Sequence, residues 1–367
     1  MIFVLSKNLK PGMTLARDVW GRNSFIPLVY AGNKLTQKAI NSFIKKDIMG
    51  VYIKCANDDT MEIQEILPME IKVRITAEIE KIFKQLENEK GSVFRCVKSL
   101  NHVADYLVEV ITETSDCMMN MIDIKNYNEY AYVHSMQVAI MCTLIGKKLN
   151  YSNAKLKEIA IAGMLHDLGK IGIPLEILDK KGALTSEEFD IMKQHPKLGL
   201  IRLGSCNSLS GNILDGIIHH HEKIDGTGYP SYLNGNQISE FGKVIAIADV
   251  FDALTSNRSY RNTWEIHTAI EYMISCSDAH FDVDLLTTFL SVVAAYPIGV
   301  LVILNNGLNA VVVDTVEGLP LNPIVKILTP GDQYGKILNL ANDREALTIQ
   351  IVDTLKDEKI IEEIISR

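Results

Sequence analysis

Polar residues of the types that bind metals stand inside apolar, helix-like segments in the middle third of the chain, and this feature constrains the fold most. His166 and Asp167 directly follow the apolar run 159–165, and Asp249 stands inside another such run, residues 244–254. A buried carboxylate without a partner is costly, or becomes neutral through a shift of its pKa. The chain must therefore fold so that these side chains meet a cation or hydrogen-bond donors.

Further histidines surround these residues in the sequence. His134 lies on an amphipathic helical stretch, His195 precedes a proline, and the run 219–221 consists of three successive histidines after two isoleucines. Neutral imidazole and carboxylate together suit manganese, iron, zinc and similar first-row ions. Successive residues of a helix lie about 100° apart, so two neighbours of the triple run can reach one site while the third points elsewhere.

Each of these positions also has an explanation that needs no metal. Helix capping would explain Asp167, core packing His134, a helix end His195, a solvated helix end the run 219–221, and an arginine partner Asp249. The glycine-containing loop 225–230 fits a surface turn as well as a loop that shapes a site. The residues alone leave both explanations open at each position.

Length and composition limit the class of protein. The chain has 367 residues, more than one domain of about 150, which predicts two or three domains. Its apolar content of 47% and charged content of 22% are ordinary for a globular protein. The net charge of −8 provides no basic field for duplex nucleic acid.

Cysteine usage and hydropathy predict the location. None of the six cysteines forms a C-x-x-C pair, which fits a reducing cytosol, so we expect a cytoplasmic protein. The apolar run at the N-terminus is too short for a secretory leader. Pro297, Gly299 and the turn at 305–307 interrupt the longest uncharged stretch, so no membrane span is expected.

Hydrophobic periodicity divides the chain into four segments. These are an N-terminal accessory α+β module at 1–58, a helical linker at 59–125, an almost wholly helical catalytic domain at 126–296, and a C-terminal β subdomain with a terminal helix at 297–367. The helices of the linker either form a dimer contact or pack within one chain. We favour the contact and expect a homodimer.

The order of these histidines and aspartates along the chain resembles the pattern of a known family. His134, then His166-Asp167, then Asp249 resemble the HD superfamily of metal-dependent phosphohydrolases. His195, the pair His220-His221 and Gly228-Tyr229-Pro230 resemble its HD-GYP branch, as do the segments 166–174, 184–188 and 248–255. The likeness covers about residues 125–290, and the number of separate motifs in the right order makes it very specific.

The resemblance implies a mainly α fold with an HD-type helical bundle as its core. It implies a phosphodiesterase of bacterial signalling that hydrolyses cyclic di-GMP to pGpG, and GMP after a second cut, by a metal-bridging hydroxide at a two-metal site. Two other functions stay open. One is hydrolysis of cyclic GMP-AMP, and the other is a non-catalytic receptor for a cyclic dinucleotide.

The resemblance also assigns roles to residues. The metal ligands would be His134, His166, Asp167, His195, His220, His221 and Asp249. Asp167 would bridge two divalent cations, expected to be iron or manganese, and Lys170 would touch the scissile phosphate or the nucleophilic water. The remaining substrate contacts would come from Arg258, Arg261, Asp252 and Tyr229.

One departure from the family pattern affects the number of metals. Some members hold a third metal with a glutamate four residues before the first histidine, and that position is Tyr130 here. Glu129 is adjacent in sequence but about 100° away around a helix, so we expect two metals. The extra His219 also permits the ligand pair 219/220. We favour 220/221, because Glu222 and the following Asp225-Gly226 then align.

Overall fold

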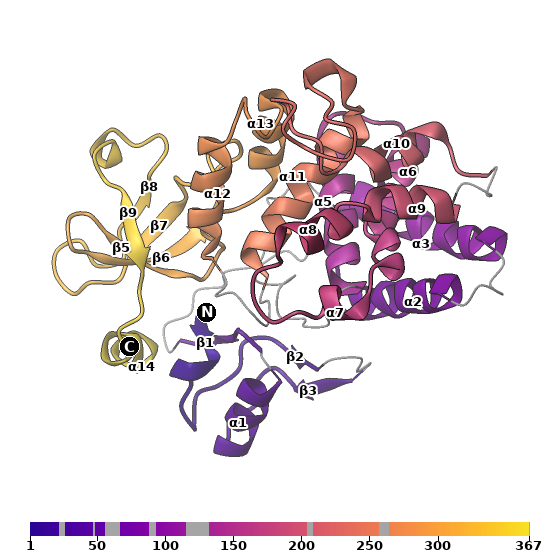
Figure 1. Cartoon of the computed structure of the whole chain (residues 1–367). Helices are drawn as coiled ribbons and strands as arrows, with labels where there is room; N and C mark the ends of the chain where they lie inside the picture. The colour runs from indigo at the N-terminus through magenta and orange to yellow at the C-terminus, as the bar shows by residue number, and fades with distance from the viewer. Residues whose placement is uncertain are drawn as a thin grey trace. The chain divides into compact units, whose positions relative to one another are not determined.

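The computed structural model of this protein describes residues 1–21, 26–46, 48–55, 67–87, 93–114, 132–203, 208–256 and 264–366. Contacts between residues divide the chain into two units. The mixed unit comprises Met1–Met69, Cys117–Asn128 and Val293–Arg367, and the helical unit comprises Glu70–Asp116 and Glu129–Val292. The mainly α fold class predicted from the sequence is confirmed (Figure 1).

The helical unit consists of helices joined by short loops. Its α-helices are α2 (Met69–Glu87), α3 (Val93–Glu113), α5 (Tyr132–Lys148), α6 (Asn153–Leu165), α7 (Leu175–Leu178), α8 (Ser186–Met192), α9 (His195–Leu203), α10 (Gly211–His219), α11 (Glu240–Thr255), α12 (Ile266–Ser275) and α13 (Val283–Val292). Two short 3-10 helices lie in the connections between these helices: η2 (Leu168–Gly172) between α6 and α7, and η3 (Gly235–Gln237) between α10 and α11.

Four of these helices form the centre of the helical unit. Helix α5 packs against α6 and α11, and α10 packs against the same two helices, so the four close a ring (Figure 1). Every residue from Val133 to Gly146 of α5 is buried, as expected for a helix that is apolar on all sides. Helices α5 and α6 cross closely, because a Cβ on Gly163 would lie 2.9 Å from the Ala139 Cα.

Helices α2 and α3, which the sequence assigned to a linker, bury their apolar residues within this one chain. Ile79 and Ile82 of α2 and Leu100 and Leu107 of α3 are at most 1% exposed, and α3 packs against α6. The Arg202 Nε of α9 also donates to the Leu86 carbonyl oxygen at the end of α2, at 2.9 Å. These contacts support packing within one chain, and the homodimer stays a prediction.

The mixed unit combines both ends of the chain. Its N-terminal part contains β1 (Ile2–Leu5), η1 (Ser6–Asn8), β2 (Val19–Trp20), β3 (Pro27–Val29), α1 (Gln37–Lys45) and β4 (Gly50–Ile53). Its C-terminal part contains β5 (Leu301–Leu304), β6 (Asn309–Asp314), β7 (Ile324–Ile327), β8 (Ile337–Asn339), η4 (Arg344–Ala346), β9 (Ile351–Thr354) and α14 (Glu358–Ser366).

Antiparallel pairing organises the strands of the mixed unit. Strands β5 to β9 form one sheet in the order β8-β7-β6-β5-β9, and β1 pairs with β4 and β2 with β3 (Figure 1). Strands β5 to β9 and helix α14 all lie within the β subdomain and terminal helix predicted at 297–367.

A single apolar core joins the two parts of the mixed unit. Phe43 of α1 belongs to the same cluster as Leu301, Val311, Leu355 and Ile361 from the C-terminal part. The Phe3 amide also donates to the Gly299 carbonyl oxygen, at 2.8 Å. The N-terminal module and the C-terminal subdomain were expected to be separate segments, whereas the structure joins them, because neither part buries these apolar faces alone.

The helices that the structure describes differ in length and in apolar content. None of them combines the length and the apolar composition needed to cross a bilayer.

Candidate metal centre

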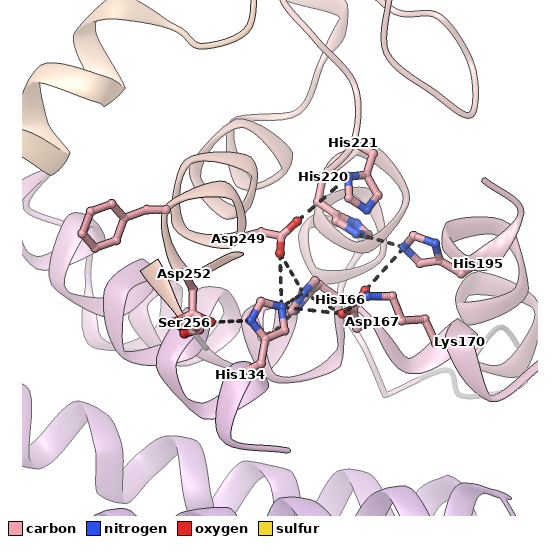
Figure 2. A network of polar contacts seen from close by, with 12 residues as sticks. His134, His166, Asp167, Lys170, His195, His220, His221, Asp249, Asp252 and Ser256 are labelled. Carbon is pink, nitrogen blue, oxygen red and sulfur yellow. Dashed lines mark hydrogen bonds and ion pairs between the residues drawn. The ribbon is translucent and has the colours of Figure 1, made fainter. Parts of the chain in front are cut away.

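The seven side chains predicted to bind metal converge at the centre of the helical unit (Figure 2). They come from α5, from the ends of α6 and α10, from the start of α9 and from α11. Their donor atoms form three overlapping groups, in each of which all the atoms lie within 4.8 Å of one another. The groups are Asp167, His195, His220 and His221; His134, His166 and Asp167; and His166, His220 and Asp249.

Main-chain carbonyls orient three of the histidines. The Nδ1 atoms of His166, His195 and His220 each face a carbonyl three residues earlier. These carbonyls belong to Gly163 at 2.7 Å, Met192 at 2.9 Å and Ile217 at 2.6 Å. A carbonyl oxygen can only accept, so Nδ1 carries the proton and Nε2 is left with a lone pair. The Nε2 atoms of His195 and His220 lie 3.3 Å apart and face the cluster.

Asp167 lies between two sets of imidazoles. Its Oδ1 is 3.4 Å from the His195 Nε2, and its Oδ2 is 3.4 Å from the His166 Nε2 and 3.6 Å from the His134 Nε2. The Lys170 ammonium approaches the same Oδ2 at 2.5 Å. The two oxygens of one carboxylate therefore face different groups of nitrogen donors, as a bridging ligand requires.

The carboxylates of the cluster are held ionised. Burial alone would raise the pKa of Asp167, but the positive charge of Lys170 and the contact with His166 hold it well below its usual range. Burial acts in the same direction on Asp249, and its hydrogen bond with His134 again outweighs it, so the pKa of Asp249 is also low. Metal binding requires carboxylates in this form.

Most of the cluster's imidazoles are neutral near pH 7. Burial lowers the pKa of His195 to about 4 and that of His221 to about 3, and it also lowers the pKa of His220. Burial acts likewise on His134, but its hydrogen bonds with Asp249 and Asp252 outweigh burial and raise its pKa to about 10. Neutral imidazoles beside ionised carboxylates are the donor set that divalent cations select, so these residues fit a metal centre.

A close contact between η2 and α9 brings Asp167 next to His195. A Cβ on Gly169 would lie 1.8 Å from the His195 carbonyl oxygen and 2.4 Å from the Gly199 nitrogen. Only glycine permits this approach of the two backbones. The segment after His166-Asp167 therefore positions the ligand from α9 as well.

The loop after the histidine run covers one side of the cluster. The Tyr229 ring stacks on the His221 ring with 4.7 Å between centroids, and the Tyr229 amide donates to the His221 carbonyl oxygen at 3.0 Å. Glu222, which is 2% exposed, accepts from the amides of Ser231 at 2.6 Å and Leu233 at 3.0 Å. The buried carboxylate thus ties the loop to the histidine run.

The structure separates the members of the histidine run. His220 and His221 contribute to the cluster, whereas His219 lies against the start of α11, where its Nδ1 accepts from the Ser239 amide at 3.3 Å. This arrangement supports the favoured pair 220/221.

The structure differs from the prediction that Asp252 contacts substrate. Asp252 is 1% exposed, and its two oxygens contact the His134 Nδ1 at 2.7 Å and the Ser256 hydroxyl at 3.1 Å. With both oxygens engaged inside the protein, this carboxylate is not available to a substrate.

Lys170 and Tyr229 border the cluster, as described above. Arg258, Arg261, Glu129 and Tyr130 lie outside the described residues.

Two partners of the ligands were not predicted from the sequence. Glu222 served only to align the histidine run, and Asp252 was expected to contact substrate. The spacing of Asp249 and Asp252 was an available signal, because residues three apart share one face of a helix. Nothing in the sequence around Glu222 indicates which amides it accepts from.

Residues 116–285 match one protein family, which is described as the HD domain. A cyclic di-GMP phosphodiesterase of Pseudomonas aeruginosa is 35% identical over 229 residues, which cover 62% of this chain and 55% of that protein. A cyclic di-GMP phosphodiesterase of Thermotoga maritima is 37% identical over 191 residues, covering 50% of this chain and 51% of that protein.

Relatives with another described substrate match the same chain. A 3′3′-cGAMP-specific phosphodiesterase of Vibrio cholerae is 34% identical over 172 residues, covering 46% of this chain and 39% of that protein. Among solved structures, an HDG"Y"P protein from Bdellovibrio bacteriovorus is 15% identical with a TM-score of 0.46, covering 78% of this chain and 97% of that one. This chain spans about half the length of the first two relatives.

Proposed function

We propose that this chain is a metal-dependent phosphodiesterase of the HD-GYP type with cyclic di-GMP as its substrate, since residues 116–285 match the HD domain family and the matching relatives include cyclic di-GMP phosphodiesterases. One observation carries the proposal. The two oxygens of Asp167 face separate groups of histidine nitrogens, at 3.4 to 3.6 Å, in a buried cluster of imidazoles and ionised carboxylates. Such an arrangement suits a pair of cations joined by one carboxylate.

The two cations would be held by the groups that share Asp167. One would use His195, His220 and His221, and the other would use His134 and His166, with Asp249 adjacent to both sets. Divalent cations bound there would supply Lewis acidity toward the phosphoryl oxygens and toward water.

The chain's own residues would bind and orient the phosphodiester. The Lys170 side chain is 35% exposed and lies beside Asp167, so its ammonium is placed to stabilise negative charge on the non-bridging oxygens. In the reaction the oxygen of water joins phosphorus and the 3′ oxygen leaves as a hydroxyl, which gives linear pGpG. A second hydrolysis would give two molecules of GMP. Arg258 and Arg261 stay the predicted contacts for the rest of the substrate.

Cyclic GMP-AMP is a second candidate substrate, because relatives described as acting on it match this chain about as well. Relatives described as 3′3′-cGAMP-specific phosphodiesterases are 34% to 38% identical to this chain. The relatives described as cyclic di-GMP phosphodiesterases are 30% to 41% identical, so identity does not separate the two substrates.

A product assay tests the proposal. Protein loaded with Mn²⁺ or, anaerobically, with Fe²⁺ is incubated with each cyclic dinucleotide, and the products are separated by HPLC. We expect pGpG from cyclic di-GMP, no product after chelation, and loss of both metal and activity in Asp167→Asn. Tight binding of the nucleotide without turnover in the fully loaded protein would instead identify a receptor.

A lysine variant separates binding of metal from catalysis. Lys170→Met should retain its metal content and lose at least about 10²-fold in kcat, because a positioned cation acts on charge that develops in the transition state. An equal loss of metal from this variant would mean that Lys170 acts through the metal centre instead.

A further inference from the structure

His134 is oriented differently from the other histidines of the cluster. Main-chain carbonyls accept from the Nδ1 of His166, His195 and His220, whereas the acceptor for the His134 Nδ1 is the Asp252 carboxylate, at 2.7 Å. A side-chain acceptor can be removed by substitution, whereas a main-chain carbonyl cannot. The role of this contact can therefore be tested directly.

The Asp252 carboxylate is itself fixed in place. It is 1% exposed, and the Ser256 hydroxyl donates to its Oδ1 at 3.1 Å (Figure 2). The Ser256 amide donates to the Asp252 carbonyl oxygen at 2.9 Å, at the end of α11. A buried carboxylate with both oxygens engaged has little freedom to move, so it defines the plane and direction of the His134 ring.

The same helix holds both nitrogens of His134. Asp249, one turn before Asp252 on α11, places its Oδ1 3.1 Å from the His134 Nε2. The His134 imidazole therefore lies between two carboxylates of α11, with Asp252 at its Nδ1 and Asp249 at its Nε2. A bound cation would displace the Nε2 proton of His134, and with Nδ1 still donating to Asp252 the Nε2 lone pair is then directed at the position shared by Asp167 and Asp249.

We infer that Asp252 is a positioning residue that holds His134 as a ligand of one metal of the pair and leaves the other metal unaffected. The inference rests on the proposed function, because it assumes two bound cations. Carboxylate partners of ligating histidines fix the tautomer and the ring orientation and increase the basicity of the ligand. Only one metal should be affected, because the ligand group of the other metal does not contain His134. That group is Asp167, His195, His220 and His221.

Binding of Mn²⁺ in the absence of nucleotide tests this inference. Equilibrium dialysis of the full-length chain, with metal analysis of each side, gives the number of equivalents and their affinities. In Asp252→Leu, which has a similar volume and no acceptor, we expect one of two equivalents to weaken by about 10- to 100-fold. The second equivalent should keep the affinity that it has in the wild type.

A conservative variant distinguishes positioning from folding. In Asp252→Asn the amide oxygen can accept from the His134 Nδ1, and the amide nitrogen can donate to Ser256 after the hydroxyl reverses its role. This variant keeps the geometry without the charge, so it should recover most of the affinity that Asp252→Leu loses. A general folding defect would lower both equivalents together.

A matched control comes from another paired aspartate of the helical unit. The Asp282 carboxylate is bound by the Lys243 ammonium at 3.0 Å and by the Leu285 amide at 3.2 Å, at the start of α13. Asp282→Asn should change stability without changing either Mn²⁺ affinity.

Two results bear on the inference and on the proposed function separately. Two unchanged equivalents in Asp252→Leu would overturn the inference and leave the proposed function intact. A single equivalent in the wild type would refute the two-metal form of the proposed function. That result would also overturn the selectivity of Asp252 for one metal of a pair, and its positioning of His134 would stand only if Asp252→Leu weakens the single equivalent.

Discussion

The two units of this chain bury different kinds of side chain. Among the described residues, every buried histidine, lysine and carboxylate lies in the helical unit, and the buried polar residues of the mixed unit are Ser6 and Asn8. All nine histidines of the sequence also fall within the helical unit. Burial of charge is costly, so its concentration in one unit marks where the chemistry takes place. Apolar packing alone accounts for the core of the mixed unit.

The largest effect should follow from breaking the closest backbone contact at the cluster. In Gly169→Ala the new Cβ would lie 1.8 Å from the His195 carbonyl oxygen, so η2 or the start of α9 must shift. A displacement of about 1 Å can cost about 10²-fold in rate, and the shift should also separate Asp167 from His195. We expect a loss of at least this size in kcat/KM, together with loss of bound metal.

Another glycine of the same unit provides the control. A Cβ on Gly211, at the start of α10, would meet no other part of the chain within 4 Å. Gly211→Ala should therefore remain close to the wild type in kcat/KM and metal content. If Gly169→Ala behaved like Gly211→Ala, the contact between η2 and α9 would not be what positions the ligands.

The mixed unit should respond in the opposite way, with a loss of stability and no loss of metal. Phe43 is fully buried in its core, and truncation of such a residue typically costs about 3–5 kcal/mol. The sequence has two tryptophans, so Trp264→Phe leaves Trp20 of β2 as the reporter of this unit. In that background, urea unfolding of Phe43→Ala should show the loss, and dialysis should show unchanged Mn²⁺ binding.

An exposed neighbour on the same helix is the control for this substitution. Ile44 is 52% exposed, so Ile44→Ala should change stability by no more than about 0.5 kcal/mol. Loss of metal from Phe43→Ala would show that the two units are energetically coupled, and the contrast between them would then be incomplete.

The elements of the mixed unit could be predicted from sequence, but not their association. Local patterns indicated an α+β module at 1–58 and a β subdomain with a terminal helix at 297–367, because periodicity is a property of short windows. The shared core joins Phe43 to Leu355, which are more than three hundred residues apart in sequence. No local pattern records which distant apolar face a given segment will cover.

The candidate site shows the same limit in a different form. His134 stands on a helix that is buried on all sides, so its direction toward the cluster could not be derived from an amphipathic pattern. The family motif supplied it. Asp252 was placed at the substrate by that same motif, whereas its actual contact with His134 depends on how α5 and α11 pack.

Acid should destabilise the metal-free helical unit and leave the mixed unit unchanged. Burial holds the pKa of His195 at about 4 and that of His221 at about 3, below the unfolded value of about 6.5. The unfolded chain therefore binds more protons, and stability falls as the pH decreases from about 6.5 to about 4. His134, with a pKa of about 10, is protonated in the folded state throughout this window, so its own contribution is nearly constant once the pH is below the unfolded value of about 6.5.

Between pH 6.5 and 5.0 the expected loss from His195 alone is about 1.5 kcal/mol, because the folded imidazole stays neutral there while the unfolded one, with a pKa of about 6.5, binds a proton. Urea unfolding of metal-free Trp20→Phe, in which Trp264 is the sole reporter, measures this loss between pH 5.0 and 6.5, above the unfolded pKa values of Asp and Glu of about 3.9 and 4.3. The Trp20 reporter should give a flat profile, since the mixed unit contains no histidine. If both reporters showed the same dependence of stability on pH, the two units would not differ in their response to acid.

The smallest expected effect tests whether the orientation of a histidine matters, or only its presence in the helical unit. His219 lies next to the ligand pair in sequence, but its Nδ1 accepts from the Ser239 amide at 3.3 Å. In His219→Asn the amide oxygen can take over this acceptor role, so turnover and Mn²⁺ stoichiometry should stay within about twofold of the wild type.

The same substitution two residues later should have the opposite result. His221 belongs to the group with Asp167, His195 and His220, and its Nδ1 lies 4.0 Å from the Asp249 Oδ2. His221→Asn should therefore weaken the metal of that group and lower kcat. A loss of metal from His219→Asn with retention in His221→Asn would instead require the pair 219/220. The end of α10 would then have to turn by one residue relative to α11, because only that rotation exchanges which imidazole faces Asp249.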